Sequence, residues 1–264
     1  MKFSLKNKWV LITGASSGFG AAAATAFAAE GAKLLLGARR IDRLKVVTAA
    51  AKKAGAAAHF HPLDVSKTSS VETFFDWAKQ KIGGRKSAVG KLHVLINNAG
   101  GAHGVDTVAN GRDEDWEAML QTNVLGILRV TRAALPLLPR DDGASILNIG
   151  SLAARAAYAG SSAYCAAKAG ELQITRVLRH ELFGTGIRVS SVDPGLAETE
   201  FALVRFKGDV KKAKELYAGA NPLVAADIAE ILVWVATRPP HVNIDEMLIK
   251  PVDQADMGKV FKRP

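Results

Sequence analysis

Short apolar runs alternate with longer amphipathic or alanine-rich stretches along most of the chain. Seven of these runs are typical of β-strands, and the second, Lys33–Ala38, is almost continuously apolar. A strand has this composition when helices cover both faces of a parallel sheet. The pattern therefore predicts a doubly wound Rossmann-type α/β fold with a seven-stranded parallel sheet. The expected strands are 8–13, 33–38, 57–63, 91–97, 145–150, 187–193 and 246–252.

The stretches between these runs predict helices that cross over the sheet. We expect helices at 21–30, 41–54, 69–82, 113–138, 162–183 and 227–237. The segment 199–221 breaks the rhythm, because it is short, charged and helical in composition. The sequence contains neither a proline- or glycine-rich linker nor a repeat. We therefore expect one domain, 1–264, with a short helical lid insertion at about 199–221.

The composition suits a sheet that is buried on both faces, since 48% of the 264 residues are hydrophobic. No apolar run approaches the roughly 20 residues that cross a bilayer. The first apolar stretch leads straight into a glycine turn, where a signal peptide would have its cleavage site. The single cysteine excludes an internal disulfide framework and fits a reducing compartment. We expect a cytoplasmic protein without a membrane partner.

The formal net charge of +10 raises the question of nucleic-acid binding, because clustered Lys and Arg attract phosphates. The basic residues fall in separate stretches, at 39–40, 79–91, 207–214 and 259–263. Aromatic residues do not interleave them, as a platform for single strands requires. The charge therefore favours solvated faces and an anionic cofactor, with no nucleic-acid partner. The six histidines are scattered, so we expect no metal site.

A glycine-rich turn, TGASSGFG at 13–20, lies between the first strand and its helix. Loops often hold three glycines, but this position at a helix N-terminus favours a dinucleotide site. The glycines let the backbone approach a diphosphate, and the helix end supplies amides and a positive dipole. We expect cofactor contacts at Gly14, Ser16, Ser17, Gly18, Phe19 and Gly20.

The end of the second strand indicates which cofactor binds. NAD sites usually place an acidic residue there, but here Arg39 and Arg40 come first, and Asp42 is the nearest carboxylate. Guanidinium groups match a phosphate bidentately. The pair therefore favours the 2′-phosphate of NADP(H), with Arg39 the better candidate. The alternative is that two exposed arginines simply open the next helix.

Two further strand ends carry candidate cofactor contacts. Asp64 and Val65 follow the third strand, where they could bracket an adenine ring, although Asp64 could equally cap the next helix. NNAG at 97–100 closes the fourth strand. Its asparagines could fix loops by hydrogen bonds, shape the cofactor pocket, or do both. The expected contacts in this loop are Asn98, Ala99 and Gly100.

Candidate catalytic residues follow the fifth strand. Ser151 ends that strand, and Tyr164 and Lys168 lie one helical turn apart, on the same face of the next helix. A phenol is a poor base because its pKa is about 10, and a nearby ammonium lowers that pKa. Ser151 can then donate a hydrogen bond to a substrate oxygen while Tyr164 transfers the proton. A Tyr–Lys pair at this interval is common by chance, but its order after the glycine turn and Ser151 favours catalysis.

These motifs, together with DPG at 193–195, resemble those of the short-chain dehydrogenase/reductase family over essentially the whole chain. The resemblance implies hydride transfer between NADP(H) and an alcohol or carbonyl. It assigns Tyr164 as acid/base and Ser151 as the group that polarises the substrate oxygen. It also implies that Lys168 lowers the tyrosine pKa and holds the nicotinamide ribose. Asn123 resembles the family's fourth catalytic residue, which supports a water relay to the lysine.

The resemblance also implies that Pro194 and Gly195 pass the nicotinamide and that Thr199 reaches its carboxamide. The segments 200–209 and 241–254 are similar to the branch of NADP-dependent 3-hydroxy acid dehydrogenases, which act on serine, allo-threonine and related acids or semialdehydes. In the lid, Arg205 or Lys207 could pair with such a carboxylate, or the lid could simply be solvated. Arg155 is a departure from that branch, and is either a second acid-binding group or a surface arginine.

Other functions fit the same motifs. One alternative is a reductase of another ketone, aldehyde or 3-ketoacyl substrate. Another is a non-catalytic NADP(H)-binding sensor or scaffold, which the joint presence of Ser151, Tyr164 and Lys168 argues against. Because family members are commonly homotetramers, we expect a homotetramer or homodimer that uses the helices at 113–138 and 162–183.

Overall fold

The computed structural model describes residues 2–83, 91–140 and 142–263, so most of the basic stretch 79–91 lies outside the described residues. Seven strands form one parallel sheet in the order β3-β2-β1-β4-β5-β6-β9, which confirms the predicted fold class. The last strand ends at Ile249 rather than at 252. The strands are β1 Trp9–Thr13, β2 Lys33–Ala38, β3 Ala58–Pro62, β4 Leu92–Asn97, β5 Ser145–Ile149, β6 Arg188–Pro194 and β9 Glu246–Ile249.

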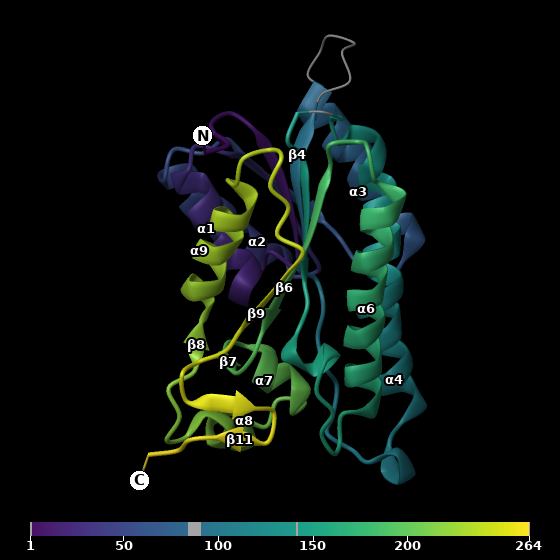
Figure 1. Cartoon of the computed structure of the whole chain (residues 1–264), viewed down its shortest axis with the longest axis vertical. Helices are drawn as coiled ribbons and strands as arrows, with labels where there is room; N and C mark the ends of the chain where they lie inside the picture. The colour runs from purple at the N-terminus through teal and green to yellow at the C-terminus, as the bar shows by residue number, and fades with distance from the viewer. Residues whose placement is uncertain (1, 84–90, 141, 264) are drawn as a thin grey trace.

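Helices cover both faces of this sheet (Figure 1). One face carries α1 Gly18–Ala29, α2 Ile41–Lys53 and α9 Ala225–Ala236. The other carries α3 Thr68–Gly83, α4 Asp113–Leu120, α5 Gly126–Ala134 and α6 Ser162–Glu181. Buried alanines on α1 and α9, among them Ala24 and Ala229, let these two helices pack closely. Among the described residues, no helix is both long and apolar enough to cross a membrane.

The helix predicted at 113–138 is interrupted rather than continuous. A π-helix, Gln121–Leu125, separates α4 from α5, and a 3₁₀ turn, Leu135–Leu137, follows α5. A π-turn adds a residue to the helix and redirects the side chains around it, often at functional sites. Here the redirected side chain is that of Asn123, which is buried.

A group of short elements lies beyond the carboxyl ends of the strands, at one end of the molecule (Figure 1). Between β7 Ala197–Glu198 and β8 Leu223–Val224, the chain forms α7 Phe201–Arg205 and α8 Val210–Tyr217. The sequence patterns did not predict the C-terminal hairpin, β10 Gln254–Asp256 and β11 Lys259–Val260. This hairpin is joined to the end of α8, since the Arg263 amide donates to the Gly219 carbonyl at 2.6 Å.

Candidate active site

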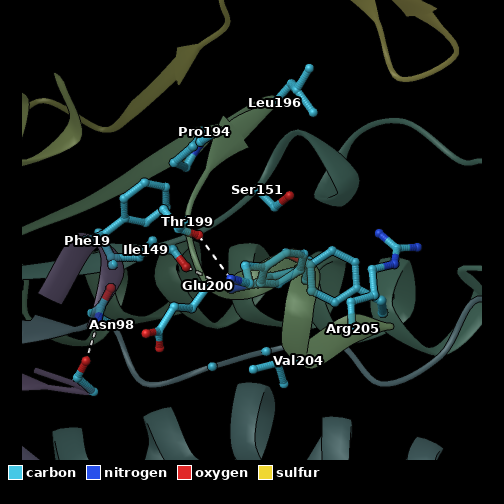
Figure 2. Close-up of a pocket in the computed structure, with 18 of the residues that line it drawn as sticks. Phe19, Asn98, Ile149, Ser151, Pro194, Leu196, Thr199, Glu200, Val204 and Arg205 are labelled. Atoms are coloured by element: carbon cyan, nitrogen blue, oxygen red, sulfur yellow. Dashed lines mark hydrogen bonds between the residues drawn. The ribbon is translucent and has the colours of Figure 1, made fainter. Parts of the chain in front are cut away.

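A cavity of about 780 Å³ opens at the carboxyl ends of the strands, between the glycine turn and the lid. This is the edge of a doubly wound sheet at which ligands bind. Phe19 and Asn98 lie towards one end of the cavity and Arg205 towards the other, with Ser151 between them (Figure 2). The cavity therefore joins the predicted cofactor turn to the predicted catalytic residues.

The glycine turn is locked against the NNAG loop. Gly14 has a φ of +65°, and a Cβ at this position would come within 2.8 Å of the Ala99 Cα atom. The Asn98 amide group donates to the Thr13 carbonyl at 2.9 Å, and Asn97 donates to the Asn148 side chain at 2.8 Å. The asparagines therefore do fix the loops by hydrogen bonds. Asn98, Ala99 and Gly100 also line the cavity, as expected.

The two arginines after β2 both line the cavity, but their contacts differ. Arg40 donates from Nε to the Ser16 hydroxyl at 3.3 Å, and it also bonds the Ser17 hydroxyl. Its Nη1 lies 2.8 Å from the Glu200 carboxylate. The hydrogen bond from Arg40 holds the pKa of Glu200 below its usual range. Arg40 is thus the arginine that hydrogen-bonds the glycine turn, although position in the sequence favours Arg39 for the phosphate.

The cavity end that is formed by this turn and these arginines fits a dinucleotide with a 2′-phosphate. The turn has glycines, which lack a Cβ atom, where the NNAG loop approaches it. The N-terminus of α1 lies at Gly18. Cationic and hydroxyl groups suit a phosphate. Asp64 and Val65 also line the cavity. The Asp64 carboxylate accepts from the Ser66 amide at 3.0 Å, so its side chain forms the turn that precedes α3.

Ser151, Tyr164 and Lys168 converge at the middle of the cavity. Ser151 follows β5, and its Oγ accepts from the Ala153 amide at 3.1 Å, so its hydroxyl hydrogen can be donated to a ligand. The Lys168 ammonium donates to the Ile149 carbonyl at 2.8 Å. Burial raises the pKa of Tyr164 above its usual value, while the Lys168 charge and the Ser151 hydroxyl lower it. The lysine thus acts on the phenol in the expected direction, but burial outweighs it.

Asn123 lies on the π-helix and faces this lysine across Gly100. Its amide group donates to the Gly101 carbonyl at 2.9 Å and the Met119 carbonyl at 2.8 Å, and its Oδ1 accepts from the Gly101 amide at 3.0 Å. A Cβ on Gly100 would lie 2.6 Å from Asn123 Oδ1 and 3.8 Å from Lys168 Nζ. The absent side chain of Gly100 therefore leaves space between Asn123 and the lysine.

Pro194, Gly195 and Thr199 line the cavity where β6 leads into the lid. Figure 2 labels Pro194 and Thr199 in this wall. Gln254 of the C-terminal hairpin supports this segment by accepting from the Leu196 amide at 2.7 Å. Other hairpin residues, and Lys262 after the hairpin, also line the cavity. The C-terminal segment is therefore part of the cavity wall. The sequence did not predict this, because the strands of the hairpin are short and polar.

Arg205 extends from α7 into the catalytic end of the cavity. Its Nη1 donates to the Tyr158 hydroxyl at 2.7 Å, and its guanidinium lies 5.8 Å from the centroid of the Tyr164 ring. The buried Nε of Arg205 has no hydrogen-bond partner among the described residues. Lys207, the alternative lid cation, instead pairs with Asp115 at 2.6 Å. Sequence reasoning missed Tyr158, which holds the arginine in place.

The structure gives Arg155 a different position from the one considered for substrate binding. Arg155 is not among the described residues that line the cavity. Its guanidinium pairs with the fully buried Asp193 carboxylate and lies 2.8 Å from Glu246. The positive charge of Arg155, which the sequence left available for an acidic substrate, is thus neutralised within the protein. Arg155 ties the segment after β5 to β6 and β9.

Comparison with known proteins extends this description. Residues 8–208 match the family model described as short chain dehydrogenase. The chain is 40% identical to a sulfoacetaldehyde reductase of Chromohalobacter salexigens, over 93% of this chain and 94% of that protein. It is 38% identical to an NADP-dependent 3-hydroxy acid dehydrogenase of Schizosaccharomyces pombe, over 98% of each. The closed form of serine dehydrogenase complexed with NADP+ superposes with a TM-score of 0.85 at 36% identity, covering 97% of this chain and 100% of that one.

Proposed function

Because the chain belongs to the short-chain dehydrogenase family and is an NADP-dependent oxidoreductase acting on CH–OH groups, we propose that its substrate is a short 3-hydroxy acid or the corresponding semialdehyde. The observation that carries this proposal is Arg205, a cation beside the Tyr164 ring whose buried Nε lacks a partner among the described residues. A guanidinium at this place suits a carboxylate or sulfonate near the reacting carbon. The three related proteins named above support it, since serine, 3-hydroxy acids and sulfoacetaldehyde all have such an anion.

We propose catalytic roles that agree with the positions of the side chains. In the oxidation direction, the Tyr164 phenolate accepts the proton of the substrate hydroxyl, while Ser151 donates a hydrogen bond to the same oxygen. The Lys168 charge stabilises the phenolate, and Asn123 supports a water relay to that lysine. NADP+ bound along the cavity wall would supply the hydride acceptor. Reduction of the semialdehyde reverses these steps.

All of the proposed cofactor contacts except Gly20 lie along the wall of the cavity, from the glycine turn to Thr199. We place the 2′-phosphate at Arg39 and Arg40 and the nicotinamide near Pro194 and Gly195. The segment 199–221 is the proposed lid of the one NADP-binding domain. The full proposed set is Gly14, Ser16, Ser17, Gly18, Phe19, Gly20, Arg39, Arg40, Asp64, Val65, Asn98, Ala99, Gly100, Tyr164, Lys168, Pro194, Gly195 and Thr199.

The proposed assembly is a homotetramer or homodimer through the α4–α6 face. Apolar side chains are exposed there, of which Phe183 is 90% exposed and Leu128 and Val177 are about half exposed. Large apolar side chains exposed in this region are consistent with the proposed interaction surface. The single cysteine, Cys165, supports the reducing cytoplasm as the proposed location.

A substrate screen tests the proposed function. Purified protein with NADP+ is assayed by NADPH absorbance against serine, allo-threonine and 3-hydroxypropionate, each paired with its methyl ester, which lacks the carboxylate. The proposal predicts a higher kcat/KM for each acid than for its ester. A preference for ketones, neutral aldehydes or 3-ketoacyl thioesters would instead establish the alternative reductase. Tight NADPH binding without any turnover would contradict both and support a sensor.

A further inference from the structure

A buried carboxylate that the proposed mechanism does not use lies against the catalytic lysine. Glu171 is on α6, one turn beyond Lys168, and its Oε2 lies 2.7 Å from the Lys168 Nζ atom. The two side chains are 1% and 8% exposed. The second oxygen, Oε1, is buried with no hydrogen-bond partner among the described residues.

Such an arrangement changes what Lys168 can do for Tyr164. A lone ammonium stabilises a phenolate, but a carboxylate at 2.7 Å offsets much of that positive charge. The offset is large here because both partners are shielded from water. The unpartnered oxygen also makes the ionised form of Glu171 costly, since a buried carboxylate needs hydrogen bonds to all its lone pairs.

One of the charges that surround this pair, that of Asp193, reinforces the effect. From β6, the fully buried Asp193 adds negative charge, and it is itself paired with Arg155. From β9, Glu246 pairs with Arg155 and with Arg176 of α6. The π-helix that packs against α6 has no titratable side chain. Burial raises the pKa of Glu171 to about 7, with the Asp193 charge adding to the rise and Lys168 opposing it.

We propose that Glu171 is a positioning residue for proton transfer, which acts through Lys168 and sets the pH at which Tyr164 accepts the proton of the alcohol. Its carboxylate offsets the positive charge of Lys168, so the lysine stabilises the phenolate less and Tyr164 stays protonated to higher pH. The inference rests on the proposed roles of Tyr164 and Lys168. It adds a third ionisable group to that pair.

The test compares Glu171→Gln, which keeps the shape and removes the charge, with Glu171→Asp, which keeps the charge. With NADP+ and 3-hydroxypropionate, the rising limb of kcat/KM against pH should move to lower pH by about one unit in Glu171→Gln. On that limb, the gain at fixed pH is about tenfold. Glu171→Asp should restore the wild-type limb. The matched control is Glu181→Gln, an exposed carboxylate of the same helix, which should leave the limb in place.

A second readout is independent of turnover. The chain has three tyrosines, so phenolate absorbance of the NADP+-bound protein, minus that of Tyr164→Phe, reports the ionisation of Tyr164 directly. This titration should move to lower pH in Glu171→Gln. An unchanged midpoint in both measurements, or a shift to higher pH, would overturn the role of Glu171. If Glu171→Gln does not fold, the phenol titration of Glu171→Asp becomes the test. The proposal predicts the wild-type midpoint for that variant, and a shift to higher pH would contradict it. A fully active Tyr164→Phe variant would instead overturn the proposed function, while leaving the phenol titration interpretable.

Discussion

The cavity adjoins a buried ion pair on its catalytic side and a more exposed group of ion pairs on its cofactor side, and these differ in their access to water. At the catalytic end, Lys168 and Glu171 are buried and held by one helix. At the cofactor end, Glu200 joins Arg40 and Arg43 with side chains that are one-third to two-thirds exposed. Coulomb interactions are strong where water is excluded and weak where it screens them. The buried pair can therefore shift the proton affinity of Tyr164, whereas the exposed pairs of Glu200 are readily broken.

The two ends of the cavity are also built from different kinds of elements. The catalytic end is built on β5, α6 and the π-helix, whose positions are fixed by the core. The cofactor end is completed by Glu200, at the start of the lid helix α7. Glu200 reaches across to arginines at the start of α2, so the lid and the proposed 2′-phosphate compete for the same cations. Binding of the cofactor would release that contact.

The largest effect is expected at the buried end. Tyr164→Phe removes only the phenol oxygen, so the ring packing near Phe201 is kept. Loss of acid/base catalysis should lower kcat by about 10²–10⁴-fold. NADPH affinity, measured by fluorescence titration, should change little. A variant that keeps near-wild-type kcat would show that the proton is transferred elsewhere.

At the exposed end, Arg40→Ala removes a charge-assisted contact to the proposed 2′-phosphate. Such a bond contributes about 1.5–3 kcal/mol, so the NADPH Kd should rise about 10- to 100-fold. The Kd for NADH, which lacks that phosphate, should change far less. Arg39→Ala serves as the matched variant and decides which of the two arginines dominates. Equal losses for NADPH and NADH in both variants would place the 2′-phosphate elsewhere.

The smallest effect is expected for Glu200→Gln. Removing the carboxylate frees Arg40 and Arg43 for the cofactor, and exposed pairs are worth about 0.2–1 kcal/mol. NADPH should therefore bind more tightly by roughly 1.5- to 5-fold. Isothermal titration at low and at high salt checks this, because screening should erase the difference. Weaker NADPH binding in this variant would mean that Glu200 supports the cofactor rather than competing with it.

The elements that repeat a simple period could be predicted from the sequence. Most of the seven strands are short runs rich in apolar residues, and the residues after them meet at one edge because the sheet is parallel. What could not be predicted depends on contacts between distant segments. Asn123 gave no sign of a π-helix, because its bonds to Gly101 form only in the folded chain. Arg155 looked available in the sequence until Asp193 and Glu246 were brought beside it.

Glu171 is an intermediate case. Its spacing from Lys168 places the two side chains on one helix face, so an ion pair could have been predicted. Its burial could not, since that depends on the packing of α6 against β5 and β6. Charged residues are rarely fully buried unless they are paired. A solvated position is therefore the simpler prediction for Glu171 from the sequence alone.

The most direct test of the substrate proposal is the ratio of kcat/KM for 3-hydroxypropionate to that for its neutral methyl ester, measured in wild type and Arg205→Ala with NADP+. Loss of a charge-assisted pair should reduce this ratio by about 10- to 100-fold. The ester's own kcat/KM should change far less. Lys207→Ala, which removes a lid cation already paired with Asp115, should leave the ratio unchanged. An unchanged ratio in Arg205→Ala would contradict the conclusion that this arginine selects an anionic substrate.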